Sequence, residues 1–321
     1  EDDNVQRIVN GESDDDPVDE EIEESDEEDP DSFLTAPEWT ITTSGMRPIQ
    51  FTRSDTLLVP VPGDGAPFDW FNLLIDDVFL ESICRYTNDY AIEVYFKPSL
   101  TPKSRINRWK PLTVPELKVF NGLILHMGTI CLNRIQDYWK TDPMFDLKYF
   151  RQSMSRDCFL LILRCLHCSK VTGDGPKESS VHKVQHVVEY FNNKMLNVYY
   201  PQKELSLDEA MVLWQGRLHF RQYIKGKRHR YGVKLYTLTE HQGLILKFLV
   251  YAGSSDKVVG GKGHTEKVVM HLLKEKLGNG HSVYMDNFYN SYSLSSRLLA
   301  HKTYSTGTLR QDRKLSPPEV K

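Results

Sequence analysis

The spacing of apolar residues divides the chain into a helical part and a part built from short strands. Between about residues 67 and 200, apolar residues recur every three or four positions, as at Leu117, Phe120 and Ile124. This is the spacing of an amphipathic helix that packs one face against a core. The pattern therefore predicts a helical domain over 67–205.

Thr113 stands where one of these helices is expected to begin. Pro115 follows within the first turn, where proline is tolerated because its missing N–H has no partner there. Glu116 comes three residues after Thr113. A threonine followed at this distance by a glutamate is typical of a capping box, in which each side chain bonds the other residue's backbone N–H.

After residue 200 the pattern changes to short segments of strand character between turn residues. The predicted order is strand, strand, strand, helix, strand, helix, strand, at 205–214, 231–239, 244–251, 265–277, 281–285, 292–300 and 304–309. Strands that alternate with helices indicate an α/β layer. Together with the preceding helical domain, this predicts an α+β chain whose second domain covers 206–321.

Charge is distributed unevenly along the 321 residues, whose net charge is −4. Residues 1–32 contain 17 acidic residues and one basic residue, which leaves 39 basic and 27 acidic residues in 33–321. A segment so charged and so poor in apolar residues cannot form a core, so we expect 1–66 to be a disordered acidic tail and linker. The balance of +12 in the remainder indicates a polyanionic partner.

Much of this positive charge lies in one stretch without acidic residues, 210–239. Aromatic residues are interleaved with its basic ones, which are Arg217, Arg221, Lys225, Lys227, Arg228, Arg230 and Lys234. Basic side chains of this kind neutralise a phosphodiester backbone and release its counterions. The alternative is a solvated charged hairpin with no ligand.

Two aspartates flank the basic stretch. Asp208 lies on the first predicted strand of the second domain, and Asp286 directly follows the fourth. If these strands are neighbours, both carboxylates can meet at one end of the sheet and hold a hard divalent cation. Such ions promote phosphoryl transfer. The alternatives are an ordinary carboxylate at Asp208 and a helix N-cap at Asp286.

Two further motifs carry weaker signals. Cys165 and Cys168, followed by His182 and His186, match the spacing of a zinc finger. The two cysteines fall on an apolar helical stripe, however, so buried reduced thiols are the better interpretation, and we expect no zinc site in this segment. The glycine-rich segment 260–265 lacks the spacing of a phosphate-binding loop and is interpreted as a flexible loop.

Compartment and membrane association follow from composition. Five cysteines, an odd number at ordinary density, favour reduced thiols in the cytosol or nucleus. No apolar run approaches the ~18 residues that a membrane-spanning helix needs, so no membrane segment is expected.

Several motifs resemble the piggyBac transposases in order and approximate spacing. In the second domain these are SLDEAM at 206–211, GR at 216–217, QY at 222–223, YGVKLY at 231–236, YMDNFY at 284–289 and TGTLR at 306–310. Upstream they are FNGLILHMG at 120–128, DYW at 137–139 and LRCLH at 163–167. The resemblance covers about residues 67–321.

The resemblance implies an RNase H-like catalytic domain with three metal-binding aspartates, of which Asp208 matches the first and Asp286 the second. It implies Mg²⁺ (or Mn²⁺), cut-and-paste cleavage and strand transfer at TTAA sites, a homodimer on double-stranded DNA, and a nuclear location. The helical region would serve dimerisation and binding of the element ends. We expect contacts to DNA from Arg217, Lys225, Lys227, Arg228, Arg230, Lys234 and Arg310.

The sequence departs from the family after Asp286. No aspartate between there and Lys321 stands in the context of the family's third ligand, so we expect a catalytic domain that is incomplete at its C-terminal end. The chain is then either a piece of a transposase or a shortened relative. The rival hypothesis is a transposon-derived, non-catalytic protein that binds DNA or chromatin. A third possibility is that the acidic tail recruits a basic nuclear partner or masks the basic body.

Overall fold

The computed structural model describes residues 45, 48–96, 101, 103–170, 180–214, 216–224, 230–254, 256–311 and 315. Residues 1–44 of the predicted tail and linker, and three of the predicted DNA contacts, Lys225, Lys227 and Arg228, lie outside them. Contacts between Cα atoms divide the chain into two compact units. We call them the helical unit (61–178 and 182–190) and the sheet unit (1–60, 179–181 and 191–321).

The prediction of disorder over 1–66 is wrong for 48–66, because this part of the linker is ordered. Thr56 pairs with Tyr200 as a short strand of the sheet unit, and the N–H of Thr52 donates to the carbonyl of Asn279 at 3.0 Å.

The helical unit is built around a cluster of aromatic side chains. The rings of Phe120 and Phe159 lie 4.8 Å apart, and Phe150 lies 4.7 Å from Tyr138. Its helices are α2 (Pro67–Leu74), α3 (Asp77–Tyr95), α4 (Val114–Thr129), α5 (Lys148–Ser153), α6 (Arg156–Cys165) and the first half of α7 (His182–Val198), with 3-10 turns η2 (Arg105–Arg108) and η3 (Ile135–Trp139). In the described part of the chain, no helix has the length and apolar character needed to cross a membrane.

Helix α4 begins where the sequence predicts, with Thr113 as the residue before its first turn. The predicted capping box is wrong, because the Thr113 side chain makes no capping hydrogen bond to the described backbone. Side-chain caps are found instead at Asp76, which accepts from the N–H of Phe79, and at Ser155, which accepts from that of Cys158.

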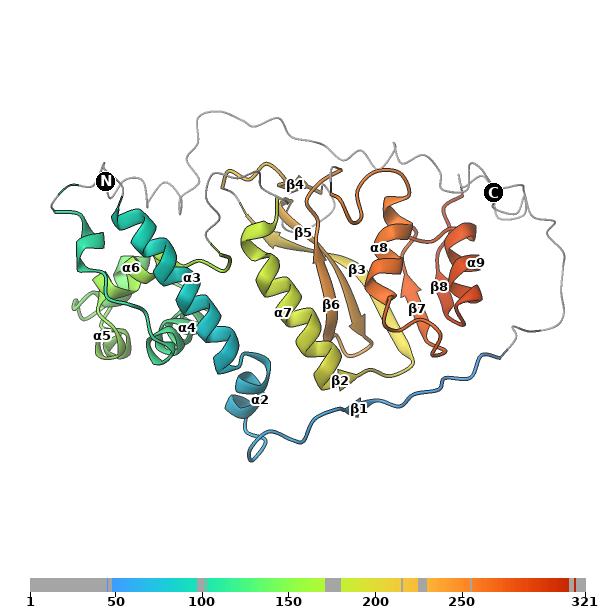
Figure 1. The fold of residues 1–321 in the computed structure, drawn as a ribbon, viewed down its shortest axis with the longest axis horizontal. Helices are drawn as coiled ribbons and strands as arrows, with labels where there is room; N and C mark the ends of the chain where they lie inside the picture. The colour runs from blue at the N-terminus through green and yellow to red at the C-terminus, as the bar shows by residue number, and fades with distance from the viewer. Residues whose placement is uncertain are drawn as a thin grey trace. The chain divides into compact units, whose positions relative to one another are not determined.

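The sheet unit contains a six-stranded sheet (Figure 1). The strand order is β4 (Gln222–Tyr223), β5 (Tyr231–Glu240), β3 (Glu204–Leu213), β7 (Ser282–Met285) and β8 (Tyr304–Gly307), and β6 (Ile245–Val250) also pairs with β5. Strand β5 pairs antiparallel with β3 and with β6, whereas β7 pairs parallel with β3 and with β8. A separate short ladder joins β1 (Thr56–Leu57) to β2 (Tyr199–Tyr200). Helices and sheet together confirm the α+β class.

One face of this sheet forms the core. Leu205 and Leu207 of β3 are buried against helices α8 (His264–Leu273) and α9 (Tyr292–Ala300), in a cluster that includes Leu272 and Leu294. Because side chains alternate along a strand, Ser206 and Asp208 point to the opposite face. The core therefore fixes which face of the sheet carries Asp208.

Helix α7 covers the outer edge of β6, beside which it runs in Figure 1. The side-chain amide of Asn192 donates to the carbonyl of Phe248 and accepts from its N–H, both at 2.9 Å. The side chain thus pairs with the edge strand as a neighbouring strand would. Exposed strand edges invite pairing with other chains, so this contact also protects the sheet.

We expect Asn192→Ala to destabilise the protein by about 1–3 kcal/mol, because it leaves both backbone groups of Phe248 without these bonds. Urea denaturation measures the free energy of unfolding. Asn193→Ala, at the next position of the same helix, is the matched control and should cost less. Equal losses for the two variants would contradict this role of Asn192.

Candidate metal-binding site at the edge of the sheet

The parallel pairing of β3 with β7 brings the two predicted aspartates together. Leu207 is the register partner of Met285, and the next residues along the two strands are Asp208 and Asp286. Neighbouring strands lie about 4.8 Å apart, so the two Cα atoms are adjacent and the side chains share a face. Both aspartates are exposed. The condition that the first and fourth strands be neighbours is therefore met.

Each aspartate also makes a local hydrogen bond that orients its carboxylate. Oδ1 of Asp208 accepts from the N–H of Glu209 at 2.8 Å, and Oδ1 of Asp286 accepts from the N–H of Phe288 at 3.0 Å. The alternative role of Asp286, to cap the turn that follows it, agrees with the bond from Phe288, whereas α9 itself is capped by Ser291 through a bond from the N–H of Leu294. Asp286 thus shapes the turn between β7 and α9.

The buried side chain of Tyr289 shows that the acidic groups converge here. Burial raises its pKa well above the ordinary value, and the carboxylate of Glu209 raises it further. The charges of Asp208 and Asp286 act in the same direction. We call Asp208, Glu209 and Asp286 the acidic edge.

The donor set of Asp208 and Asp286 fits a hard divalent cation. Mg²⁺ prefers oxygen ligands and is commonly held by one or two carboxylates, with water and substrate phosphate completing its shell. Within the described ranges, no group of three or more His, Cys, Asp or Glu side chains is placed to hold a metal. The described residues thus supply two ligands, both open to solvent.

The predicted DNA contacts differ in their surroundings. Arg217 and Arg230 are exposed and Arg310 is half-buried. Lys234 is buried, with its ammonium group 4.7 Å from the centre of the Tyr236 ring and 4.8 Å from that of Phe288. It lies on the core face of β5, so the structure does not present it as a surface contact to DNA.

The two weaker motifs serve local packing. Cys165 is buried in α6, and the ring of His186 bonds through Nε2 to the hydroxyl of Ser82 at 2.8 Å. The glycine-rich segment precedes α8 and is fastened to it by a bond of 2.8 Å from Lys267 Nζ to the carbonyl of Gly260.

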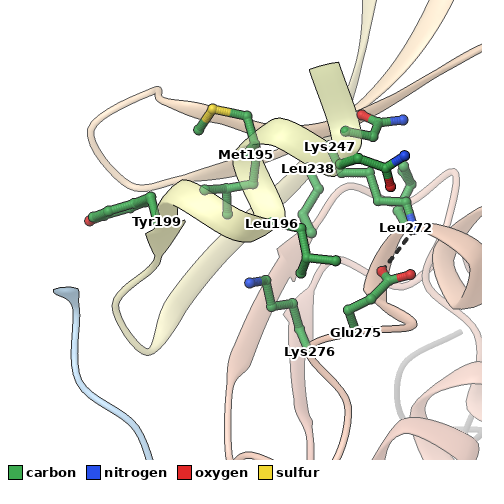
Figure 2. A pocket seen from close by; sticks show the side chains of 11 residues that line it. Met195, Leu196, Tyr199, Leu238, Lys247, Leu272, Glu275 and Lys276 are labelled. Carbon is green, nitrogen blue, oxygen red and sulfur yellow. Dashed lines mark hydrogen bonds and ion pairs between the residues drawn. The ribbon is translucent and has the colours of Figure 1, made fainter. Parts of the chain in front are cut away.

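A small cavity of about 80 Å³ lies elsewhere in the sheet unit, next to α7 and α8 (Figure 2). At its wall, Lys247 Nζ is paired with Glu275 at 2.8 Å. Lys276 also lines it and is 6% exposed, with Nζ 4.2 Å from the centre of the Tyr200 ring. Burial lowers the pKa of Lys276 from 10.5 to about 8. No sequence signal marked this buried cation.

We expect Lys276→Met to stabilise the protein at pH 7. The lowered pKa means that the protonated form is penalised in the folded state, fully so below about pH 8. The penalty for the buried charge is roughly 3 kcal/mol, and the attraction to the Tyr200 ring, which methionine lacks, offsets roughly 1 kcal/mol of it. The free energy of unfolding should therefore rise by about 2 kcal/mol.

The gain should shrink as pH rises from 8 towards 10.5, where lysine loses its proton in both states. Urea denaturation at pH 7 and pH 10 measures it. Lys274→Met, at an exposed neighbouring position, is the control and should change little. A variant of Lys276 that is less stable at pH 7 would contradict the cost assigned to its charge.

Comparisons with known proteins agree on one family. The family model described as Transposase IS4 matches residues 66–321. PiggyBac transposable element-derived protein 3 of Homo sapiens is 25% identical over 280 residues, which cover 82% of this chain and 45% of that protein. The Chimeric ERCC6-PGBD3 protein of Homo sapiens is also 25% identical over 280 residues, which cover 25% of its length. This chain thus spans less than half of these relatives.

The fold is similar to that in the cryo-EM structure of the piggyBac transposase synaptic complex with hairpin DNA. The TM-score is 0.68 at 23% sequence identity, over 83% of this chain and 55% of that one. The family model covers most of the chain, and the resemblance seen in the sequence motifs is confirmed. This chain belongs to the transposase family of that model, among the piggyBac and piggyBac-derived proteins.

Proposed function

We propose that this chain forms part of a DNA transposase that cleaves and joins phosphodiester bonds with a divalent cation held by Asp208 and Asp286. The observation that carries the proposal is the register of β3 and β7, which makes these aspartates neighbours at one edge of the sheet. Family membership supports the same reaction class.

The topology supports an RNase H-like catalytic domain. Three antiparallel strands, β3, β5 and β6, are followed by two strands that run parallel to β3 and are connected by α8 and α9. In this arrangement a carboxylate in the middle of the first strand and one at the end of the first parallel strand come together. Asp208 and Asp286 occupy these two positions.

The acidic residues of this chain would bind the metal, and the basic residues would bind DNA. Asp208 and Asp286 would hold Mg²⁺ (or Mn²⁺), which when bound would activate the attacking oxygen and stabilise the leaving one. Arg217 and Arg230, both exposed, would neutralise phosphates of the DNA backbone. Lys225, Lys227 and Arg228, which lie between them in the sequence, would add to this contact.

The finer features of the family belong to the same proposal. These are cut-and-paste activity at TTAA sites, a homodimer on double-stranded transposon ends, dimerisation and DNA binding by residues 67–205, a contact from Arg310, and a nuclear location. The known structure of a piggyBac transposase in a synaptic complex with hairpin DNA supports DNA as the partner.

A second candidate is a transposon-derived protein that binds DNA without cutting it. It is favoured by the 25% identity over 280 residues to a protein that is named as transposable element-derived. The exposed arginines would then bind DNA in the same way, with no cleavage.

We expect Asp286→Asn to abolish Mg²⁺-dependent cleavage while DNA affinity is kept or rises. The variant removes one negative charge from the acidic edge but keeps the oxygen that accepts the N–H of Phe288. The test is cleavage of DNA carrying piggyBac-type element ends, with binding measured by fluorescence anisotropy on the same duplex.

Asp256→Asn is the matched control. Its Oδ1 accepts from the N–H of Val258 at 2.8 Å in a turn of the same kind, between β6 and α8. It should cut at the wild-type rate. Cleavage by Asp286→Asn at the wild-type rate would overturn the role of Asp286, and a full-length protein that binds DNA without cutting it would favour the second candidate.

A further inference from the structure

The turn that carries Asp286 is fastened to its surroundings at several points. Asn290 donates through Nδ2 to the carbonyls of Gly307 and Thr308, both at 3.2 Å. The ring of Phe288 lies against the ammonium group of Lys234 on β5. Tyr289, which is 1% exposed, donates from its hydroxyl to Oε2 of Glu209 at 3.2 Å. The last bond reaches β3, the strand of Asp208.

Glu209 follows Asp208 directly but points the other way. Side chains alternate along a strand, so Glu209 shares the core face of β3 with Leu205 and Leu207, and Asp208 the opposite face. A cation held between Asp208 and Asp286 is therefore on the far side of the sheet from the Glu209 side chain. This geometry makes Glu209 a support of the site and not a third ligand.

The surroundings of Tyr289 hold its ring in place. It packs edge-on against the ring of Tyr236, whose hydroxyl lies 2.6 Å from Nε2 of His264. Nδ1 of His264 donates to the carbonyl of Val259 at 2.6 Å, and in the neutral ring Nε2 then accepts from the hydroxyl of Tyr236. The Tyr289 hydroxyl is thus presented to Glu209 by a packed and hydrogen-bonded layer.

We propose that the hydrogen bond from Tyr289 to Glu209 is a clamp that sets the distance between Asp208 and Asp286, and so tunes the affinity of this edge for a divalent cation. The inference rests on the proposed function, because it takes these two aspartates as the ligands. Glu209 and Tyr289 are positioning residues in this account. Neither would touch the cation.

The clamp acts because small divalent cations tolerate little error in ligand placement. Mg²⁺ requires near-ideal octahedral geometry, and groups that orient its ligands commonly change affinity by about 10–100-fold when removed. Asp208 sits within a ten-residue strand, whereas Asp286 lies just beyond the end of a four-residue strand. The bond between Glu209 and Tyr289 therefore constrains the less fixed ligand against the more fixed one.

The test is Mn²⁺ affinity of the full chain, measured by calorimetric titration without DNA. We expect Tyr289→Phe and Glu209→Ala each to weaken binding about tenfold, and the double variant to weaken it no further, because both remove one bond. Glu209→Gln should bind as the wild type does, since its amide oxygen still accepts from Tyr289. If Glu209 were a ligand, Glu209→Gln would lose affinity and Tyr289→Phe would not.

Tyr199→Phe is the matched control. It also removes a tyrosine hydroxyl that donates to a glutamate, Oε2 of Glu240 at 2.9 Å, but at the end of β5 that pairs with Leu205. It should leave Mn²⁺ affinity unchanged. Hydrogen exchange of the peptide 285–291 without metal should rise in Tyr289→Phe and not in Tyr199→Phe.

The outcomes distinguish a failure of the proposed function from a failure of the clamp. A wild type whose Mn²⁺ binding does not depend on Asp208 and Asp286 overturns the proposed function. A wild type that binds through them, together with an unchanged affinity in Tyr289→Phe, overturns the clamp alone.

Discussion

The parallel pairing of β3 with β7 is the constraint on which the site depends. Its register places Asp208 beside Asp286, although 77 residues separate them in the sequence. The pairing is held by the core, because Leu205, Leu207, Val283 and Met285 all bury their side chains against α8 and α9. A slip of one residue would turn either strand over and move its carboxylate to the core face of the sheet. Burial of apolar side chains thus sets the geometry of the exposed acidic groups.

Much of the sheet unit is predictable from the sequence, because apolar residues recur at every second position in a strand and at every third or fourth position in a helix. The pattern predicted 292–300 as a helix and 304–309 as a strand, and α9 and β8 begin at Tyr292 and Tyr304. The pairing partners were not predictable in the same way, since register depends on contacts between distant segments. The sequence could state only that Asp208 and Asp286 would meet if their strands were neighbours.

The errors have local causes. Lys234 was counted with the basic hairpin by composition, but it alternates with Tyr236 and Leu238 on β5, and that spacing places it on the core face. Thr113 has the residues of a capping box, yet capping also needs a side-chain rotamer that the sequence does not specify. Lys276 lies among exposed and apolar residues in the sequence, and its burial involves contacts with distant residues such as Tyr200. The motif residues Glu209 and Tyr289 were quoted for their resemblance, while their contact required the fold.

The central claim is that Asp208 and Asp286 bind one divalent cation between them. The most direct measurement is a crystal structure of the chain soaked in Mn²⁺, with the ion located by its anomalous scattering. The account predicts a single strong peak within bonding distance of one carboxylate oxygen from each aspartate, on the face of the sheet away from Glu209. A peak that contacts neither aspartate, or aspartates turned away from each other with the ion bound elsewhere, would contradict it.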